Sequence, residues 1–209
     1  MDFDTNITDE LLATTRAVRK RLDLTRPVPR EVISNCLDLA VQAPTGSNSQ
    51  TWRWLIVEDA DKRKALAELY KKSASGYLAS AAEQAGDDQT KRVFSSAMYL
   101  MDHLHEVPVH VIPCVEGRPP AGTPAAMMAG LFGSIFPAVW SFQLALRSRG
   151  LGSVLTTLHL LQEEAAAELL GIPDNVMQVA LLPVAYTKGT DFKRANRPPV
   201  SDITHWNSW

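Results

Sequence analysis

One long stretch without ionisable side chains constrains the fold more than any other feature of the sequence. From Pro119 to Leu146 the chain carries no Asp, Glu, Lys, Arg or His. A membrane span needs about 20 apolar residues, so length alone permits one. Against a span stand several prolines and the polar side chains of Ser134, Ser141 and Gln143. We therefore predict a soluble protein with no membrane contact, in which this segment forms a buried helix, in part at a subunit interface.

Composition narrows the class of protein further. The 209 residues are 45% hydrophobic, with 21 Lys and Arg against 23 Asp and Glu, a net charge of -2. This balance gives no reason to expect nucleic acid or an anionic membrane as a partner. Cys36 and Cys114 lie far apart, as expected of reduced thiols, and the acidic N-terminus lacks the order of a signal peptide. We predict one cytoplasmic domain over residues 1–209.

Periodicity predicts a mixed α+β fold with helices packed on a small sheet. We expect a first helix capped by Thr8 that carries Arg16 and Arg19 on one face, and a second helix with Pro29 in its first turn. Further predicted helices cover residues 62–72, 91–105 and 162–170, with a helix or loop over 76–86. Strands are expected at 52–57, 107–115 and 176–185. Pro108 and Pro113 favour an edge position or a bulge for the strand at 107–115.

The common catalytic and cofactor motifs are missing from the sequence. The segment from Gly150 to Leu155 begins like a dinucleotide fingerprint but lacks its third glycine, and neither a phosphate loop nor a nucleophile elbow occurs. His103, His105 and His110 form a local cluster, but residues two apart on a helix do not face each other. We therefore predict no metal site and name no catalytic side chain.

Small polar and basic elements at the ends of helices and strands are the remaining candidates. Arg16 and Arg19 could hold one phosphate together, although a solvated basic helix end fits the same pattern. The loop at 45–50 offers backbone amides, hydroxyls and side-chain amides without charge, as any surface loop does. Thr156 and Thr157 follow a glycine-containing turn whose amides could face a ligand. Arg194 and Arg197 could add cations to a phosphate site.

The order of these elements resembles that of the FMN-dependent nitroreductase family. The family opens on an Arg-rich RRSxR element, and residues 15–19 here read Thr-Arg-Ala-Val-Arg. Its APSxxNxQPW loop, which leads into the first strand, is similar to residues 43–52, Ala-Pro-Thr-Gly-Ser-Asn-Ser-Gln-Thr-Trp. Residues 150–153 look like its GLGS turn, and residues 194–198 resemble its basic C-terminal element. The resemblance covers nearly the whole chain.

The resemblance implies an antiparallel sheet flanked by helices, in a homodimer with two interface FMN sites and an exchanged C-terminal tail. It further implies that FMN would be bound by Arg16, Ala17 and Arg19 near the phosphate, ribityl chain and pyrimidine, and by Arg194 and Arg197 at the phosphate. The other subunit would contribute Pro44, Thr45, Gly46 and Asn48. Beside the ring would lie Leu155, Thr156 and Thr157, where a backbone N–H would bond the flavin nitrogen that takes the hydride. Thr15 and Ala17 replace the family's first Arg and its Ser, and Thr51 replaces the Pro before Trp52.

The implied activity is hydride transfer from NAD(P)H to FMN, followed by two-electron transfer to a small nitroaromatic or quinone acceptor in ping-pong fashion. Two alternatives stay open. One is a specialised flavin enzyme of the same fold, such as a reductive dehalogenase or an enoate-type reductase. The other is a flavin-binding protein without turnover.

Overall fold

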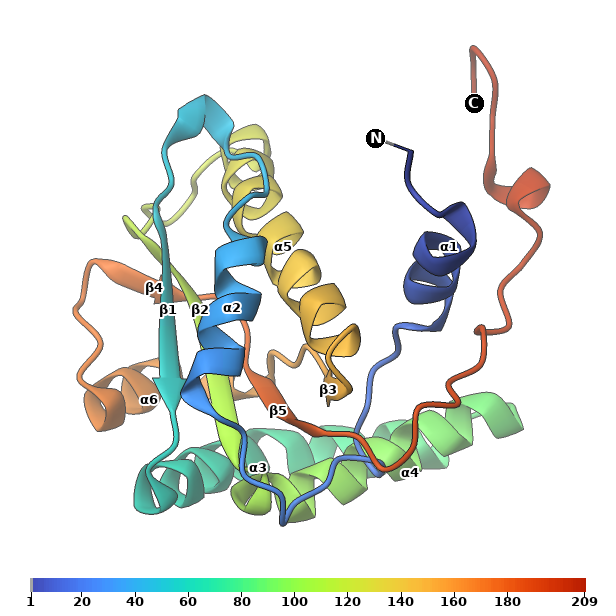
Figure 1. Cartoon of the computed structure of the whole chain (residues 1–209). Coiled ribbons are helices and arrows are strands. Elements are labelled where there is room, and N and C mark those ends of the chain that lie inside the picture. Colours follow the sequence, from blue (N-terminus) through green and yellow to red (C-terminus); the bar gives the residue numbers. More distant parts are fainter. Residues whose placement is uncertain (1) are drawn as a thin grey trace.

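The computed structural model describes residues 2–209, and a five-stranded antiparallel sheet forms its centre. The strands run in the order β1-β2-β5-β3, and the short β4 pairs with β2 beside β5 (Figure 1). Their bounds are Trp52–Val57 for β1, Val109–Glu116 for β2, Leu151–Ser153 for β3, Val176–Gln178 for β4 and Leu182–Tyr186 for β5. The predicted α+β class with a small antiparallel sheet is confirmed.

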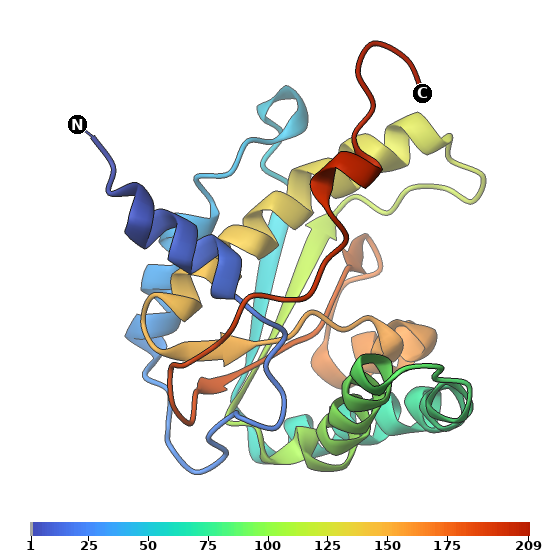
Figure 2. The same cartoon turned by 90° about the vertical axis from the view of Figure 1, so that its right-hand side faces the viewer.

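Six α-helices surround the sheet. Their bounds are Thr5–Thr14 for α1, Arg30–Ala40 for α2, Ala60–Glu83 for α3, Asp88–His103 for α4, Ala125–Arg147 for α5 and Glu163–Leu170 for α6. Helices α2 and α5 cover one face of the sheet, and α3, α4 and α6 cover the other (Figures 1 and 2). Side chains of β2 alternate between the two cores: Val111 packs with α2 and α5, and Ile112 packs with α3.

Pro108 and Pro113 predict an edge position or a bulge for the second strand. The edge position is wrong, because β2 is the central strand, but the register of its partners shifts by one residue beside Pro113, as in a bulge. Pro113 is tolerated there because of where it stands along β2. On its far side β2 pairs with β5 over Val109–Val111 and with β4 over Cys114–Glu116. Pro113 falls between these two ladders, where its carbonyl accepts the Val179 N–H at 3.0 Å. The N–H that proline lacks would face the same break, so no ladder hydrogen bond is lost.

The first helix begins and ends earlier than the sequence predicts. Its N-cap is Asp4, whose carboxylate accepts the N–H groups of Asn6 and Ile7, whereas Thr8 lies inside the helix. The helix ends at Thr14, so Arg16 and Arg19 do not share a helix face. This prediction is wrong because the segment after Thr14 does not continue the helix. It runs extended beside β3, where Ala17 pairs with Ser153.

Two other boundaries differ from the prediction. The helix predicted at 62–72 and the segment at 76–86, predicted as a helix or a loop, merge into α3. The helix continues through the exposed Gly76 because Ala74 and Leu78 on either side of it are buried. The apolar run at 176–185 divides into β4 and β5. Between them Leu181 exchanges two backbone hydrogen bonds with Thr156, at 2.8 and 3.0 Å, so the connection to the loop after β3 interrupts the ladder.

The uncharged segment forms α5, as predicted, and its two halves differ in burial. The C-terminal half packs against α2 through Ile135, Phe142 and Leu146, which are buried. The N-terminal half is largely exposed, and Met127 is 66% accessible. By length and hydropathy α5 could cross a membrane, but one such helix is weak evidence, because core helices pass the same test.

The C-terminal segment runs along the outside of the molecule, and its end stands away from the body together with the N-terminal end of α1 (Figures 1 and 2). Its first part is fixed. Arg21 forms an ion pair with Asp191 at 2.6 Å, and the guanidinium groups of Arg21 and Arg147 both lie over the ring of Phe192. Farther along, Trp206 is largely exposed and Trp209 fully exposed within one chain.

Candidate functional site

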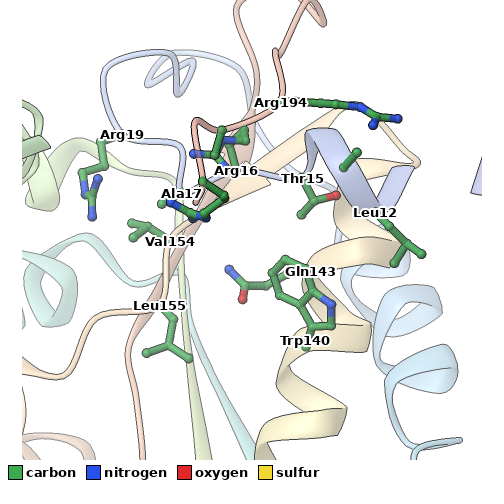
Figure 3. Close-up of a pocket in the computed structure, with 13 residues that line it drawn as sticks. Leu12, Thr15, Arg16, Ala17, Arg19, Trp140, Gln143, Val154, Leu155 and Arg194 are labelled. Atoms are coloured by element: carbon green, nitrogen blue, oxygen red, sulfur yellow. The ribbon is translucent and has the colours of Figure 1, made fainter. Parts of the chain in front are cut away.

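A cavity of about 610 Å³ lies where the segment after α1, the C-terminal half of α5, the residues after β3 and the C-terminal segment meet (Figure 3). Half of the predicted site residues line it: Arg16, Ala17, Arg19, Leu155, Arg194 and Arg197. They come from three parts of the chain that are distant in sequence. The volume is typical of a cofactor site, for which roughly 300–1,000 Å³ is common.

Backbone pairing with β3 places the arginine segment at the cavity. Ala17 bridges to Ser153 in parallel, and the Val18 N–H donates to the Ser153 carbonyl at 2.9 Å. This close approach requires a glycine beneath it. A Cβ on Gly152 would lie 2.7 Å from Cγ2 of Thr187 and 2.9 Å from Cβ of Val18. The family-like glycine at 152 is therefore a packing requirement of the site.

The lining of the cavity is strongly positive. Arg16, Arg19, Arg194 and Arg197 line it, and within residues 2–209 none of them has a carboxylate within 4 Å. Arg19 donates to the Ser96 hydroxyl at 3.2 Å, and burial lowers the pKa of its guanidinium. Four guanidinium groups without acidic partners are a typical site for a phosphate.

One wall of the cavity is apolar with one amide. Trp140 is 44% exposed and forms the wall together with Val154 and Leu155. Gln143, one turn along α5, is buried and donates to the Ser153 hydroxyl at 3.0 Å. Figure 3 shows Gln143 and Trp140 side by side on α5. Sequence reasoning missed both residues, although their spacing of three on an otherwise apolar helix was a usable signal.

Thr156 and Thr157 lie next to the cavity without lining it. The N–H of Thr156 donates to the Leu181 carbonyl at 3.0 Å, and its hydroxyl donates to the Tyr70 hydroxyl at 3.2 Å. Burial raises the pKa of Tyr70. Across the described part of the chain, the N–H groups of Leu155 and Thr157 donate to no protein acceptor. Of the three residues predicted beside the flavin ring, only Leu155 and Thr157 therefore have a backbone N–H that can donate to a ligand.

The loop with Pro44, Thr45, Gly46 and Asn48 lies away from the cavity of its own chain. The Gly46 N–H donates to the Ser134 hydroxyl at 3.0 Å, about 9 Å along α5 from Trp140. Ser47, Asn48 and Gln50 have φ values of 53°, 51° and 47°. Three left-handed non-glycine residues within four positions are costly, and such strain clusters at binding sites.

His103 and His110 have structural hydrogen-bond partners, and both cysteines are buried. His110 is buried and bonds the Leu104 carbonyl at 2.8 Å, and His103 pairs with Glu106 at 2.5 Å. In the part of the chain that the structure describes, no three His, Cys, Asp or Glu side chains gather as metal ligands would. Cys36 and Cys114 are both buried, and burial raises the pKa of Cys114 to about 12. Neither thiol is a reactive nucleophile.

Comparisons with known proteins agree with this architecture. The nitroreductase family model matches residues 12–186. An iodotyrosine deiodinase of Thermotoga neapolitana is 27% identical over 198 residues, covering 95% of this chain and 97% of that protein.

Two solved structures share the fold. A crystal structure of oxidised iodotyrosine deiodinase bound to FMN and 3-iodo-L-tyrosine aligns with a TM-score of 0.74 and 25% identity, over 96% of this chain and 99% of that one. An FMN-dependent nitroreductase of Mycobacterium smegmatis in complex with NADPH aligns with a TM-score of 0.70 and 21% identity, over 98% and 99%. The family match over most of the chain and the shared antiparallel fold lead to one conclusion: the chain belongs to the nitroreductase family of flavin oxidoreductases.

Proposed function

We propose that this chain binds FMN in the 610 Å³ cavity and passes electrons from NAD(P)H to a small-molecule acceptor. The observation that carries the proposal is the two-part lining of the cavity. It combines four arginines that have no carboxylate within 4 Å with an apolar wall that includes Trp140 and Leu155. FMN has two matching parts, with a phosphate at one end and a flat aromatic ring system at the other.

The phosphate end fits the residues present. Within residues 2–209, no hydrogen bond or ion pair occupies the guanidinium groups of Arg16, Arg194 and Arg197, so all three can serve a phosphate. A charge-assisted hydrogen bond is about twice as strong as a neutral one. Three separate guanidinium groups compensate for the arginine that Thr15 replaces and the hydroxyl that Ala17 replaces. The hydroxyl of Thr15 is itself occupied, since it donates to the Leu11 carbonyl at 2.6 Å.

The ring end of the cavity orients the flavin and balances its charge. Bound FMN supplies the redox chemistry, because it accepts a hydride and returns two electrons. Arg19 is partly buried and fixed by Ser96, so its charge is held in place at the pyrimidine end. A fixed cation there stabilises negative charge on the ring when it is reduced. A backbone N–H of Leu155 or Thr157 would bond the nitrogen that takes the hydride. No acid or base side chain is required.

We further propose a homodimer in which the second copy completes each site. One chain leaves apolar surface exposed on three elements: Ile7 on α1, Met127 and Trp140 on α5, and Trp206 and Trp209 in the C-terminal segment. Large apolar side chains exposed on several elements of one chain are typical of a surface that a partner covers. In the dimer this surface would be buried by exchanged C-terminal segments. The strained loop, with Pro44, Thr45, Gly46 and Asn48, would reach the flavin of the other copy.

The proposed substrates are NAD(P)H and a nitroaromatic or quinone acceptor that use one exposed flavin face in turn. Such shared use predicts ping-pong kinetics. Initial rates measured with both substrates varied should give parallel double-reciprocal lines. Intersecting lines would contradict the proposal, because both substrates would then be bound at once.

Reductive dehalogenation is a second candidate, favoured by the similarity to iodotyrosine deiodinases. Iodide released from 3-iodo-L-tyrosine by the dithionite-reduced holoenzyme would support it.

A flavin-binding role without turnover is tested by stopped-flow absorbance. Rapid bleaching of the flavin by NADH or NADPH would support the reductase. A flavin that stays oxidised for minutes would refute the reductase and favour the binding role.

A further inference from the structure

We propose that the protein has a second anion-binding site beside the flavin cavity, which holds a phosphate or carboxylate group of the small molecule that exchanges electrons with the flavin. The proposal rests on the proposed function and adds the chemical class of its substrate. The site lies between the N-terminal half of α4 and residues 195–197 of the C-terminal segment. It has a volume of about 450 Å³.

This second cavity shares a wall with the first one. Arg16, Ala17, Arg19 and Arg197 line both cavities. The opposite wall is new and comes from α4, with Gln89, Arg92, Val93 and Ser96, and Asn196 adds an amide from the C-terminal segment. An anion held here would therefore lie next to a molecule bound in the first cavity.

Two side-chain contacts fix α4 at this position. Arg19 donates to the Ser96 hydroxyl at 3.2 Å, and Lys20 donates to the Ser95 hydroxyl at 3.0 Å. Ser96 in turn donates to the Val93 carbonyl at 2.8 Å. These hydrogen bonds join the segment at residues 16–20 to α4. The α4 residues that line the second cavity are therefore held in a fixed position beside Arg16 and Arg19.

The charges of the two cavities favour more than one bound anion. Five guanidinium groups line them: those of Arg16, Arg19, Arg92, Arg194 and Arg197. A phosphate monoester carries about two negative charges at neutral pH, so FMN alone leaves a clear positive excess. No carboxylate lines the second cavity. A second anionic ligand balances this charge.

Arg92 is the donor best placed to serve a ligand that comes and goes. It is exposed, and across residues 2–209 it has no carboxylate within 4 Å. The nearby carboxylate of Asp87 caps α4, since it accepts the N–H and the hydroxyl of Thr90 at 2.9 and 2.6 Å. These hydrogen bonds, together with the charge of Arg92 beyond 4 Å, lower the pKa of Asp87. Gln89, one turn earlier on α4, adds a neutral donor of the kind that surrounds bound oxyanions.

The test compares anionic and neutral members of two matched pairs on the FMN holoenzyme. One pair is NADPH and NADH with a neutral quinone as acceptor, and the other is 4-nitrobenzoate and 4-nitrobenzamide with one reductant. The variants are Arg92→Gln and the control Lys91→Gln. The control removes the same charge from the neighbouring position of α4, at a residue outside the cavity lining.

We expect Arg92→Gln to lower the anionic-to-neutral ratio of kcat/KM by roughly tenfold in at least one pair, the value of one charge-assisted hydrogen bond. Lys91→Gln should leave both ratios within twofold of the wild type. A change in the NADPH pair identifies the 2′-phosphate as the ligand group, and a change in the nitrobenzoate pair identifies a carboxylate. Ratios within twofold in both pairs, or an equal fall in Lys91→Gln, would overturn the proposal.

Failure of the proposed function has a different signature. A wild-type holoenzyme that binds FMN but reduces no acceptor refutes turnover. The anion site is then judged by calorimetric titration of the same holoenzymes with adenosine 2′,5′-bisphosphate and 4-nitrobenzoate. Weaker binding of either anion in Arg92→Gln than in Lys91→Gln supports the site, and equal binding of both overturns it.

Discussion

Replacing Gly152 with alanine tests whether the pairing of the arginine segment with β3 builds the site. A Cβ at this position would lie 2.7 Å from Cγ2 of Thr187, and 2.9 and 3.0 Å from Cβ and Cγ2 of Val18. Unstrained carbon contacts are about 3.5–4.0 Å, so the neighbours must retreat by roughly an ångström. Thr187 and Val18 approach from two different segments, so one rotamer change cannot relieve both contacts.

The size of the effect follows from overpacking. Forcing one methyl group into such a contact costs about 1–3 kcal/mol. For a chain of this size, each kcal/mol shifts Tm by about 2–4 °C, so Gly152→Ala should lower Tm by about 2–12 °C. The retreat of Val18 also lengthens its 2.9 Å hydrogen bond to Ser153. Because that bond positions Arg16 and Arg19, the Kd for FMN should rise about tenfold.

The assay is thermal unfolding of the flavin-free chain, together with FMN titration by quenching of flavin fluorescence. Gly76→Ala in α3 is the matched control, since a Cβ there has no neighbour within 4 Å. An alanine in an exposed helix interior should stabilise the fold by about 0.5–1 kcal/mol. If Gly152→Ala matches the wild type in both Tm and Kd, the close approach does not build the site.

Three other predictions concern charge and burial. His159 is fully buried, and among the described residues the neighbouring Gln178 side chain makes no well-formed hydrogen bond to either ring nitrogen. Desolvation lowers the pKa of His159 to about 4 from 6.5. The neutral form is therefore favoured in the fold, and stability falls as pH drops from 6.5 toward 4, by up to about 1.4 kcal/mol per pH unit. His159→Leu should raise the unfolding free energy and flatten this decline in urea titrations at pH 7, 6 and 5, and an unchanged slope refutes the reasoning. Arg118 bonds both carboxylate oxygens of Glu163, at 3.0 and 2.8 Å, and this holds the pKa of Glu163 below its usual 4.5. Glu163→Gln should therefore lower Tm by about 2–4 °C at pH 7, and the difference should vanish as pH falls below 4.5; a difference that persists in acid counts against the ion pair. Arg197→Gln should raise the Kd for FMN about tenfold, whereas Lys193→Gln, outside the cavity lining, should not. Equal effects of the two would mean that the positive charge acts only at long range.

Sequence patterns predicted the elements whose signals are local. The apolar periodicity after Pro29 gave α2, and the β-rich run at 52–57 gave β1 with the same bounds. They failed where distant segments decide the structure. Nothing near Thr14 ends a helix by propensity, and α1 stops there because the next residues pair with β3. Pro113 argued against a central strand, but it stands where the partner strand changes from β5 to β4.

The same division holds for the candidate site. Arginines at 16, 19, 194 and 197 were predicted from motif order, and the fold gathers them around one cavity. Trp140 and Gln143 were not predicted, because the uncharged sequence around them is equally typical of a helix buried in the hydrophobic core. Arg92 escaped it because the sequence does not reveal that α4 folds back beside the arginine segment. Such contacts depend on tertiary packing, which no local pattern encodes.

The flavin content of the purified protein tests the central claim most directly. Its visible spectrum should show the bands of oxidised flavin, and heating should release FMN close to one per chain, because each chain contributes one cavity with four unpaired arginines. A colourless protein that also takes up no added FMN would contradict the account. The arginine cluster would then serve another anion, and the replacements at Thr15 and Ala17 would mark a lost flavin site.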